Sequence, residues 1–170
     1  KTNDGPRNPK ERYKIMTSEM PKNGSLSLNM MYQTAGTQIN LDYESENDFK
    51  KKFKLISYLT PLSVALFANS PIAEGKKTGF LSYRSKVWQN TSRGGLPKIF
   101  LEDMDFEKYA DFALNYPLLF IYRDNKYLEA NGKSFKDLLS KLDMKDFELH
   151  LSTIFTELRL KKYIEIRSLD

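Results

Sequence analysis

Two segments near opposite ends of the chain alternate between apolar and polar residues, and this alternation constrains the fold more than any other feature. In residues 30–43 the apolar and polar side chains fall on opposite sides: Ile39, Leu41 and Tyr43 against Gln38, Asn40 and Asp42. In residues 159–167 the two sides hold Ile164 and Ile166 against Tyr163, Glu165 and Arg167. A period of two predicts strands with an apolar back and a polar front.

Helical signals lie between the two alternating segments. Ser45 followed by Asp48 predicts a capped helix start, and Phe49, Phe53 and Ile56 then follow at helical spacing. We expect Pro61 to kink or split this helix, with a buried second half over 62–68. Further helices are predicted over 12–20, 105–114, 134–142 and 147–154.

A hairpin is predicted where residues 118–123 and 126–129 flank Asp124 and Asn125. Strands and helices mix without a regular βαβ rhythm, which favours an α+β fold with an antiparallel sheet. Residues 1–11 are polar and rich in Pro, Gly and Asn, so they are predicted to form a tail or linker ahead of one domain over 12–170.

The composition excludes several classes of protein. The 170 residues include no cysteine, so a disulfide framework, a thiolate metal site and a cysteine nucleophile are ruled out. The single histidine, His150, rules out a His-rich zinc site, and its place beside an apolar helix face favours a satisfied, half-buried side chain. No apolar run is long enough to span a bilayer. The net charge of +5 fits an anionic substrate or a nucleic acid, and supports both only weakly.

The polar fronts of the two strands carry the first chemical signal. If both face one cleft, Gln38, Asn40, Asp42 and Glu165 offer oxygen ligands for Mg²⁺, and Arg167 offers a guanidinium for phosphate or carboxylate. The alternative is a plain amphipathic sheet with a solvated face, which the pattern alone favours. Phosphate-binding glycine loops of the Rossmann and Walker types are absent from the sequence.

Arg84 carries the second signal, because it lies among Phe80, Tyr83 and Trp88. An arginine flanked by aromatic residues suits a bidentate grip on a carboxylate in a partly desolvated wall. The alternative, a surface arginine stacked on an aromatic ring, is favoured without further information.

Four segments of the chain resemble glutamate–cysteine ligase of the form shared by plants and proteobacteria. They are 12–22, which contains RYKIM, then MMYQTAGTQINLDY at 30–43, ALFANSPIAEGKKTGFLSYRSKVW at 65–88, and HLSTIFTELRLKKYIEIRSLD at 150–170. The resemblance runs over nearly the whole chain in the same order. It implies a catalytic domain like that of glutamine synthetase, with a curved antiparallel sheet and helices packed behind it.

The implied reaction is the first step of glutathione biosynthesis in a cytoplasmic enzyme. ATP phosphorylates the γ-carboxylate of L-glutamate, and the amine of L-cysteine then displaces phosphate. Because this chemistry brings anions together, the site must supply Mg²⁺ and cationic side chains. Glutamate, cysteine and ATP are therefore the implied partners, and neither a nucleic acid nor a membrane is expected.

The resemblance also implies roles for individual residues. Arg12 and Arg84 match the family's glutamate-binding arginines, Trp88 matches the tryptophan that lines the glutamate pocket, and Gln38 is a further candidate contact for substrate or metal. The plant form's redox-switch cysteines have no counterpart here, so disulfide regulation is not expected.

The last strand carries the catalytic pair that the resemblance implies. Glu165 matches the family's carboxylate ligand of Mg²⁺, and Arg167 is placed to meet the ATP phosphates or the acyl phosphate. Because the family enzyme is longer at both ends, we expect residues 12–170 to be part of its catalytic domain, inactive alone. Two alternatives remain open: a noncatalytic glutamate-binding homologue, and a small basic nucleic-acid-binding module.

Overall fold

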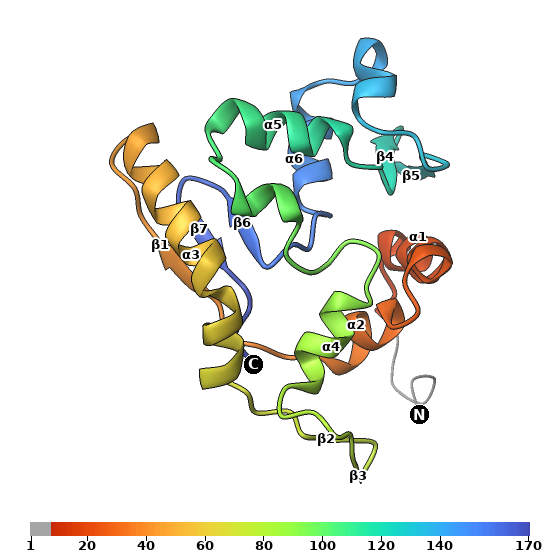
Figure 1. The fold of residues 1–170 in the computed structure, drawn as a ribbon. Helices are drawn as coiled ribbons and strands as arrows, with labels where there is room; N and C mark the ends of the chain where they lie inside the picture. The colour runs from red at the N-terminus through yellow and green to blue at the C-terminus, as the bar shows by residue number, and fades with distance from the viewer. Residues whose placement is uncertain (1–7) are drawn as a thin grey trace.

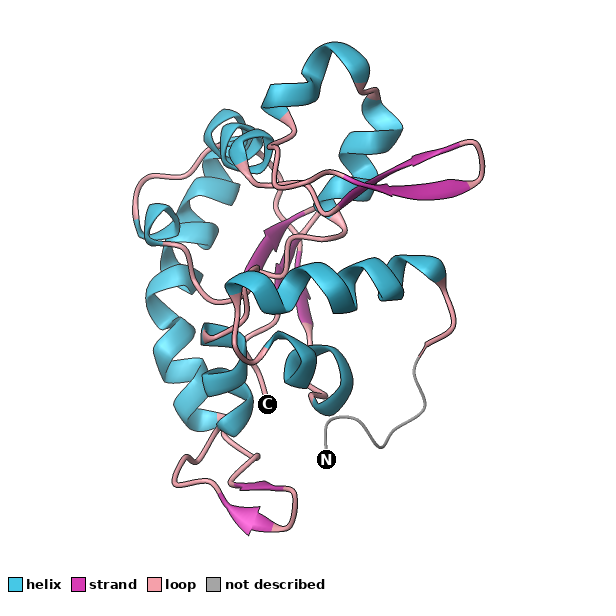
Figure 2. Cartoon of the chain, turned by 90° about the vertical axis from the view of Figure 1, so that its right-hand side faces the viewer, coloured by secondary structure: helices cyan, strands magenta, loops and turns pink. Residues whose placement is uncertain are grey.

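A computed structural model describes residues 8–170, in which helices surround a small antiparallel sheet (Figures 1 and 2). The α-helices are α1 (Glu11–Glu19), α2 (Ser27–Gln33), α3 (Glu46–Leu66), α4 (Tyr83–Gln89), α5 (Phe106–Asn115) and α6 (Met144–Leu151). The 3₁₀ helices are η1 (Met20–Asn23), η2 (Lys98–Leu101) and η3 (Lys136–Lys141). The strands are β1 (Ile39–Leu41), β2 (Ile72–Ala73), β3 (Lys76–Lys77), β4 (Phe120–Arg123), β5 (Lys126–Glu129), β6 (Leu158–Leu160) and β7 (Ile164–Ile166). This mixture confirms the α+β class.

The two alternating segments meet in one sheet of order β1-β7-β6, with both neighbouring pairs antiparallel. In β7, Glu165 lies opposite Asn40 of β1 and Arg159 of β6. Directly opposed residues point to the same face of a sheet, so these polar side chains share one front. The likeness to glutamine synthetase stays a prediction.

The first alternating segment is shorter as a strand than predicted, because residues 30–33 belong to α2. Asn29 donates a side-chain hydrogen bond to Gln33 at 2.7 Å, and Thr34 donates from Oγ1 to the carbonyl of Met30 at 2.8 Å. Met30 is buried among the side chains around Trp88. Leucine and methionine are good helix formers, and burial of one face outweighs the weak alternation. All three residues of β1 are exposed.

The second alternating segment is two strands and not the single strand predicted over 159–167. The chain reverses between β6 and β7, where the backbone N–H of Lys161 donates to the carbonyl of Tyr163 at 2.8 Å. Lys161 and Lys162, two consecutive polar residues, interrupt the alternation at the turn, and the single-strand prediction passed over this mark. The reversal brings Arg159 and Glu165 onto one face.

Helix α3 begins as predicted, with Ser45 accepting the N–H of Asp48 at 3.2 Å. The helix continues unbroken past Pro61, so the predicted split does not occur. Its second half is not buried, because Leu62 is 54% and Leu66 is 72% exposed. The apolar spacing predicts a helix face, but it does not show which element packs on that face. Within the described residues this face is exposed to solvent.

The core lies behind the sheet. Ile164 and Ile166 of β7 pack against Phe49 and Phe53 of α3, together with buried residues of η2 and α5. This arrangement confirms helices behind the apolar face of β7, whereas Ile39 and Leu41 of β1 are exposed. It leaves the polar front of β7 directed away from α3. A second apolar cluster joins α1, α2 and α4 around Trp88.

The remaining sequence signals are largely confirmed. Asp105 caps α5 through the N–H of Lys108, and strands β4 and β5 pair through Asp124 and Asn125, whose φ angles of 49° and 60° suit a tight hairpin turn. The predicted helix over 134–142 is the short 3₁₀ helix η3.

The N-terminal prediction is tested only in part. Residues 1–7 of the predicted tail lie outside the described residues, and α1 begins at Glu11. Across residues 8–170, none of the helices has the length and apolar character needed to cross a membrane.

Candidate active site

Helix α4 places Arg84 and Trp88 four residues apart, on one face. Ser82 caps the helix by accepting the N–H of Ser85 at 3.1 Å. Residues at this spacing are neighbours on a helix, and the guanidinium carbon of Arg84 lies 4.7 Å from the centre of the Trp88 ring. Arg84 is only 5% exposed, so it is a buried cation and not the surface arginine of the alternative interpretation.

The end of β7 brings a second guanidinium to the same indole. The guanidinium carbon of Arg167 lies 4.9 Å from the centre of the Trp88 ring. Arg84 donates from Nη2 to the backbone carbonyl of Arg167 at 2.7 Å. Burial lowers the pKa of Arg167 to about 10, so the group is still protonated at neutral pH. One buried and one largely buried positive charge therefore share one aromatic ring, an arrangement that favours an anionic ligand.

Glu165 lies beside this pair but is held by other cations. Arg159 and Lys161 both donate hydrogen bonds to its carboxylate at 2.5 Å, and Nε of Arg167 lies 3.5 Å from Oε2. Burial alone would raise the pKa of Glu165, but Lys161 and Arg159 outweigh burial and hold the pKa below its ordinary value. Glu165 is therefore ionised, and it links Arg167 to two further cations.

Unsatisfied polar atoms gather around the two arginines. The buried atoms without a hydrogen-bond partner include Arg84 Nε, Arg167 Nε, Arg167 Nη1, Trp88 Nε1 and Glu157 Oε2. Buried donors are normally paired, so such a cluster is a candidate place for a ligand that accepts hydrogen bonds. Four of these five atoms are N–H donors, and a carboxylate or phosphate supplies only acceptors.

Arg12 lies in a different cavity from Arg84. A cavity of about 460 Å³ is lined by Arg12 together with Arg159 and Lys161, the two cations that hold Glu165. Arg84 lines a cavity of about 380 Å³ with Asp170. The two cavities are connected through side chains: Arg159 and Lys161 bind Glu165, which contacts Arg167 on Trp88.

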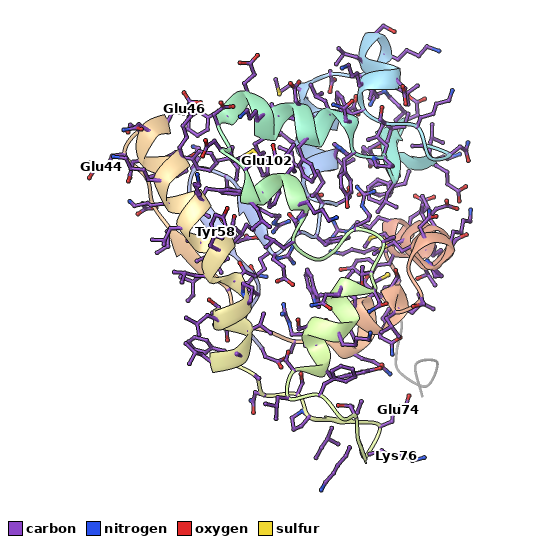
Figure 3. All side chains as sticks on the ribbon, viewed as in Figure 1. Glu44, Glu46, Tyr58, Glu74, Lys76 and Glu102 are labelled. Carbon is purple, nitrogen blue, oxygen red and sulfur yellow. The ribbon has the colours of Figure 1, made fainter. Side chains whose placement is uncertain are left out.

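The cavity that Arg84 lines is bordered by the β2–β3 hairpin, through Ile72, Ala73 and Glu74. The tip of this hairpin, marked by Glu74 and Lys76, projects from the rest of the chain (Figure 3). The last candidate, Gln38, is exposed one residue before β1. Continuing the β1–β7 register places it opposite Arg167. The structure thus brings together Arg84, Trp88, Glu165 and Arg167, and leaves Arg12 and Gln38 at the margins.

Comparison with known proteins identifies the family. Residues 1–170 match the family described as "Glutamate-cysteine ligase family 2(GCS2)". The chain belongs to this family.

Curated relatives of the family cover almost all of the chain. It is 46% identical over 179 aligned residues to "Glutamate--cysteine ligase A, chloroplastic" from Oryza sativa subsp. japonica and to "Glutamate--cysteine ligase, chloroplastic" from Medicago truncatula. Each alignment covers 98% of the chain, and 36% and 35% of the respective relative. The chain therefore spans about a third of the length of these relatives, as expected for part of a ligase.

The expected cytoplasmic location is contradicted by these names. The relatives from rice, Medicago and Arabidopsis thaliana are all named chloroplastic. The absence of cysteine had fitted a reducing compartment, but cysteine content does not distinguish cytosol from plastid stroma.

A magnesium site of this ligase family is not complete in the described residues. Both carboxylate oxygens of Glu165 already accept hydrogen bonds from Arg159 and Lys161. Across residues 8–170, no group of three or more His, Cys, Asp or Glu side chains is placed to hold a metal ion. Magnesium prefers several oxygen ligands, so the side chains present do not fit the ion by themselves.

Three residues of the site were missed from the sequence. Arg159 and Lys161 become visible only once the β6–β7 turn is known, since the turn sets them beside Glu165. Glu157 lies just before β6, where no sequence pattern marks it. The prediction of a satisfied, half-buried histidine is confirmed only in part: His150 is fully buried, with Nε2 2.8 Å from the carbonyl oxygen of Ala113, and its Nδ1 has no hydrogen-bond partner among the described residues.

Proposed function

We propose that this chain carries the glutamate-binding part of an ATP-dependent ligase that joins the γ-carboxylate of L-glutamate to the amine of L-cysteine. Membership of the glutamate–cysteine ligase family supports the reaction, which is the first step of glutathione synthesis. One structural observation supports the assignment of the site. Arg84 and Arg167 lie over the same indole, Trp88, with their unpaired donors buried beside it.

The proposed chemistry follows from the charges at this place. Transfer of a phosphoryl group to a carboxylate brings two anions together, and preorganised cations lower the cost of that approach. In this proposal Arg84 and Arg167 hold a carboxylate of glutamate, and the Trp88 ring keeps water from their faces. The contact of Arg167 with the ATP phosphates or the acyl phosphate stays a prediction. Glu165 orients Arg159 and Lys161 toward the cavity that also contains Arg12. A contact of Gln38 with substrate stays a prediction.

Magnesium and ATP enter the proposal through the family. The ion would neutralise phosphate charge when bound, and Glu165 as its ligand stays a prediction, since its oxygens are occupied by cations. We further propose that residues 12–170 are part of the catalytic domain and have little ligase activity alone. A ligase assay of this polypeptide with ATP, Mg²⁺, glutamate and cysteine tests that statement, and robust turnover would refute it.

The binding assignment is tested with a matched pair of ligands. Trp88 is the only tryptophan of the chain, so its fluorescence reports directly on the site. We expect L-glutamate to change the emission of Trp88, and L-glutamine, which lacks the γ-carboxylate, to bind at least about tenfold more weakly. Equal affinities for the two ligands would contradict the assignment. A glutamate-induced change that accompanies no turnover in the complete enzyme would favour the noncatalytic homologue.

A further inference from the structure

Glu157 is a buried carboxylate that the proposed reaction does not use. Its side chain is 3% exposed, and Oε2 has no hydrogen-bond partner. Within residues 8–170, its carboxylate forms no ion pair. An unpaired carboxylate in such a place is costly, so its retention calls for a compensating charge nearby.

The backbone of Glu157 fixes its place beside the arginine pair. The N–H of Arg167 donates to the carbonyl of Glu157 at 2.8 Å, and the N–H of Glu157 donates to the carbonyl of Gly95 at 2.9 Å. Arg84 is tied to the same stretch of β7 through the carbonyl of Arg167. Glu157 and both guanidiniums therefore sit on one rigid framework.

The electrostatic neighbours of Glu157 agree with this placement. Burial raises the pKa of Glu157, and Arg84 followed by Arg167 act in the opposite sense. Asp170 also acts on Arg84, but its Oδ2 accepts hydrogen bonds from the backbone of Asn69 and the hydroxyl of Ser70. Glu165 is similarly committed to Arg159 and Lys161. Among residues 8–170, Glu157 is thus the acidic neighbour of both arginines whose carboxylate has no hydrogen bond or ion pair.

We propose that Glu157 is the resident counter-ion of the Arg84–Arg167 pair and determines which anions the pair binds. Two guanidiniums and one carboxylate leave a single net positive charge, which matches one carboxylate group. This inference rests on the proposed function, in which the pair holds a carboxylate of glutamate. Glu157 acts through the arginines, so it is a positioning and specificity residue and not a catalytic one.

Charge selectivity follows from Coulomb's law in a poorly solvated site. Removing the charge of Glu157 leaves two positive charges beside Trp88. A dianion gains twice as much from that change as a monoanion, and the gain is large where the effective dielectric constant is low. Glu157 therefore keeps phosphate-like dianions from competing with the carboxylate of the substrate.

The test compares acetate with sulfate, a monoanion with a dianion, at constant ionic strength. Binding is followed through the fluorescence of Trp88, the ring that both guanidiniums contact. In Glu157→Gln we expect the affinity for sulfate relative to acetate to rise by about tenfold. Glu157→Asp keeps the charge and should keep the ratio of the parent protein. Glu102→Gln removes an exposed carboxylate at the end of η2 (Figure 3) and is the matched control.

The outcomes separate this inference from the proposed function. If acetate does not affect Trp88 in the parent protein, the proposed function fails first. If acetate binds but Glu157→Gln leaves the ratio unchanged, or Glu157→Asp shifts it equally, the counter-ion role is refuted. Should Glu157→Gln not fold, Arg84→Gln and the double variant Arg84→Gln/Glu157→Gln carry the test. The single variant should lose acetate binding and the double variant recover it, and no recovery would refute the role.

Discussion

Arg84 donates a hydrogen bond from Nη2 to the backbone carbonyl of Arg167 at 2.7 Å, which joins helix α4 to the end of strand β7 across 83 positions of sequence. The bond holds one guanidinium to the backbone that carries the other, and both lie within 5 Å of the Trp88 ring centre. Like charges at this spacing repel, so the pair is stable only with counter-ions and gains most when an anion binds.

Gly36 makes room for this arginine. A methyl group at position 36 would lie 2.6 Å from Nε of Arg84 and 2.7 Å from the carbonyl oxygen of Leu169. Because the second neighbour is backbone, it cannot simply move aside. We expect Gly36→Ala to destabilise the protein by about 2 kcal/mol and to weaken glutamate binding about tenfold. Chemical denaturation and a glutamate titration measure the two effects.

The control for Gly36→Ala is Gly132→Asn. Gly132 has a φ of 76° with open space where a side chain would begin, and asparagine tolerates this left-handed conformation. Gly132→Asn should leave glutamate affinity unchanged. If Gly36→Ala binds glutamate as tightly as the parent protein, the position of Arg84 does not control binding.

The Trp88 ring contacts two guanidiniums. Losing the aromatic face should therefore lower the free energy of unfolding more than a reduction in ring size alone. Trp88→Phe keeps an aromatic face and should lower the free energy of unfolding by about 1 kcal/mol, whereas Trp88→Leu should lower it by about 3 kcal/mol. Urea denaturation followed by circular dichroism gives both values. Equal losses in the two variants would show that the guanidiniums draw no stability from the aromatic face.

His150 makes stability depend on pH. Burial lowers its pKa from 6.5 to about 4, with Nε2 bonded to the carbonyl of Ala113. Between these two pKa values the unfolded chain binds the proton and the folded chain does not, so stability falls as the pH drops below 6.5. We expect a loss of about 3 kcal/mol between pH 7 and pH 4.

The variant His150→Gln isolates this effect from the other titrating groups. Glutamine can still donate a hydrogen bond to Ala113 but does not titrate in this range. The difference in unfolding free energy between the two proteins should therefore shrink by about 3 kcal/mol on acidification. Parallel pH curves would mean that His150 is protonated at little cost in the folded state.

Strand alternation and helical spacing predicted those parts of the site whose residues lie close together in the sequence or on one strand face. Alternation placed Asn40 and Glu165 on one face, and the spacing of Arg84 and Trp88 made them helix neighbours once α4 was present. The turn at Lys161 escaped prediction, although Lys161 and Lys162 interrupt the alternation there. Conversely, α2 formed where a strand was expected because tertiary burial of Met30 decided the conformation.

Long-range packing supplied the rest. The contact of Arg167 with Trp88 and the separation of Arg12 into another cavity depend on how α1, α4 and β7 are placed, which no short segment specifies. The exposure of the second half of α3 could not be predicted for the same reason. Hydrophobic spacing indicates an apolar helix face but not the element that packs against it. The resemblance to the ligase family indicated the candidate site residues but could not show which of them are in contact.

The most direct test of the arginine pair is the glutamate affinity of Arg84→Ala, measured calorimetrically on the complete enzyme beside Lys126→Ala as a surface control. Removing a charge-assisted contact should cost about 1.5–3 kcal/mol of binding free energy, and the control, exposed on β5, should lose nothing. An Arg84→Ala enzyme that binds glutamate as tightly as its parent would contradict the assignment of this site.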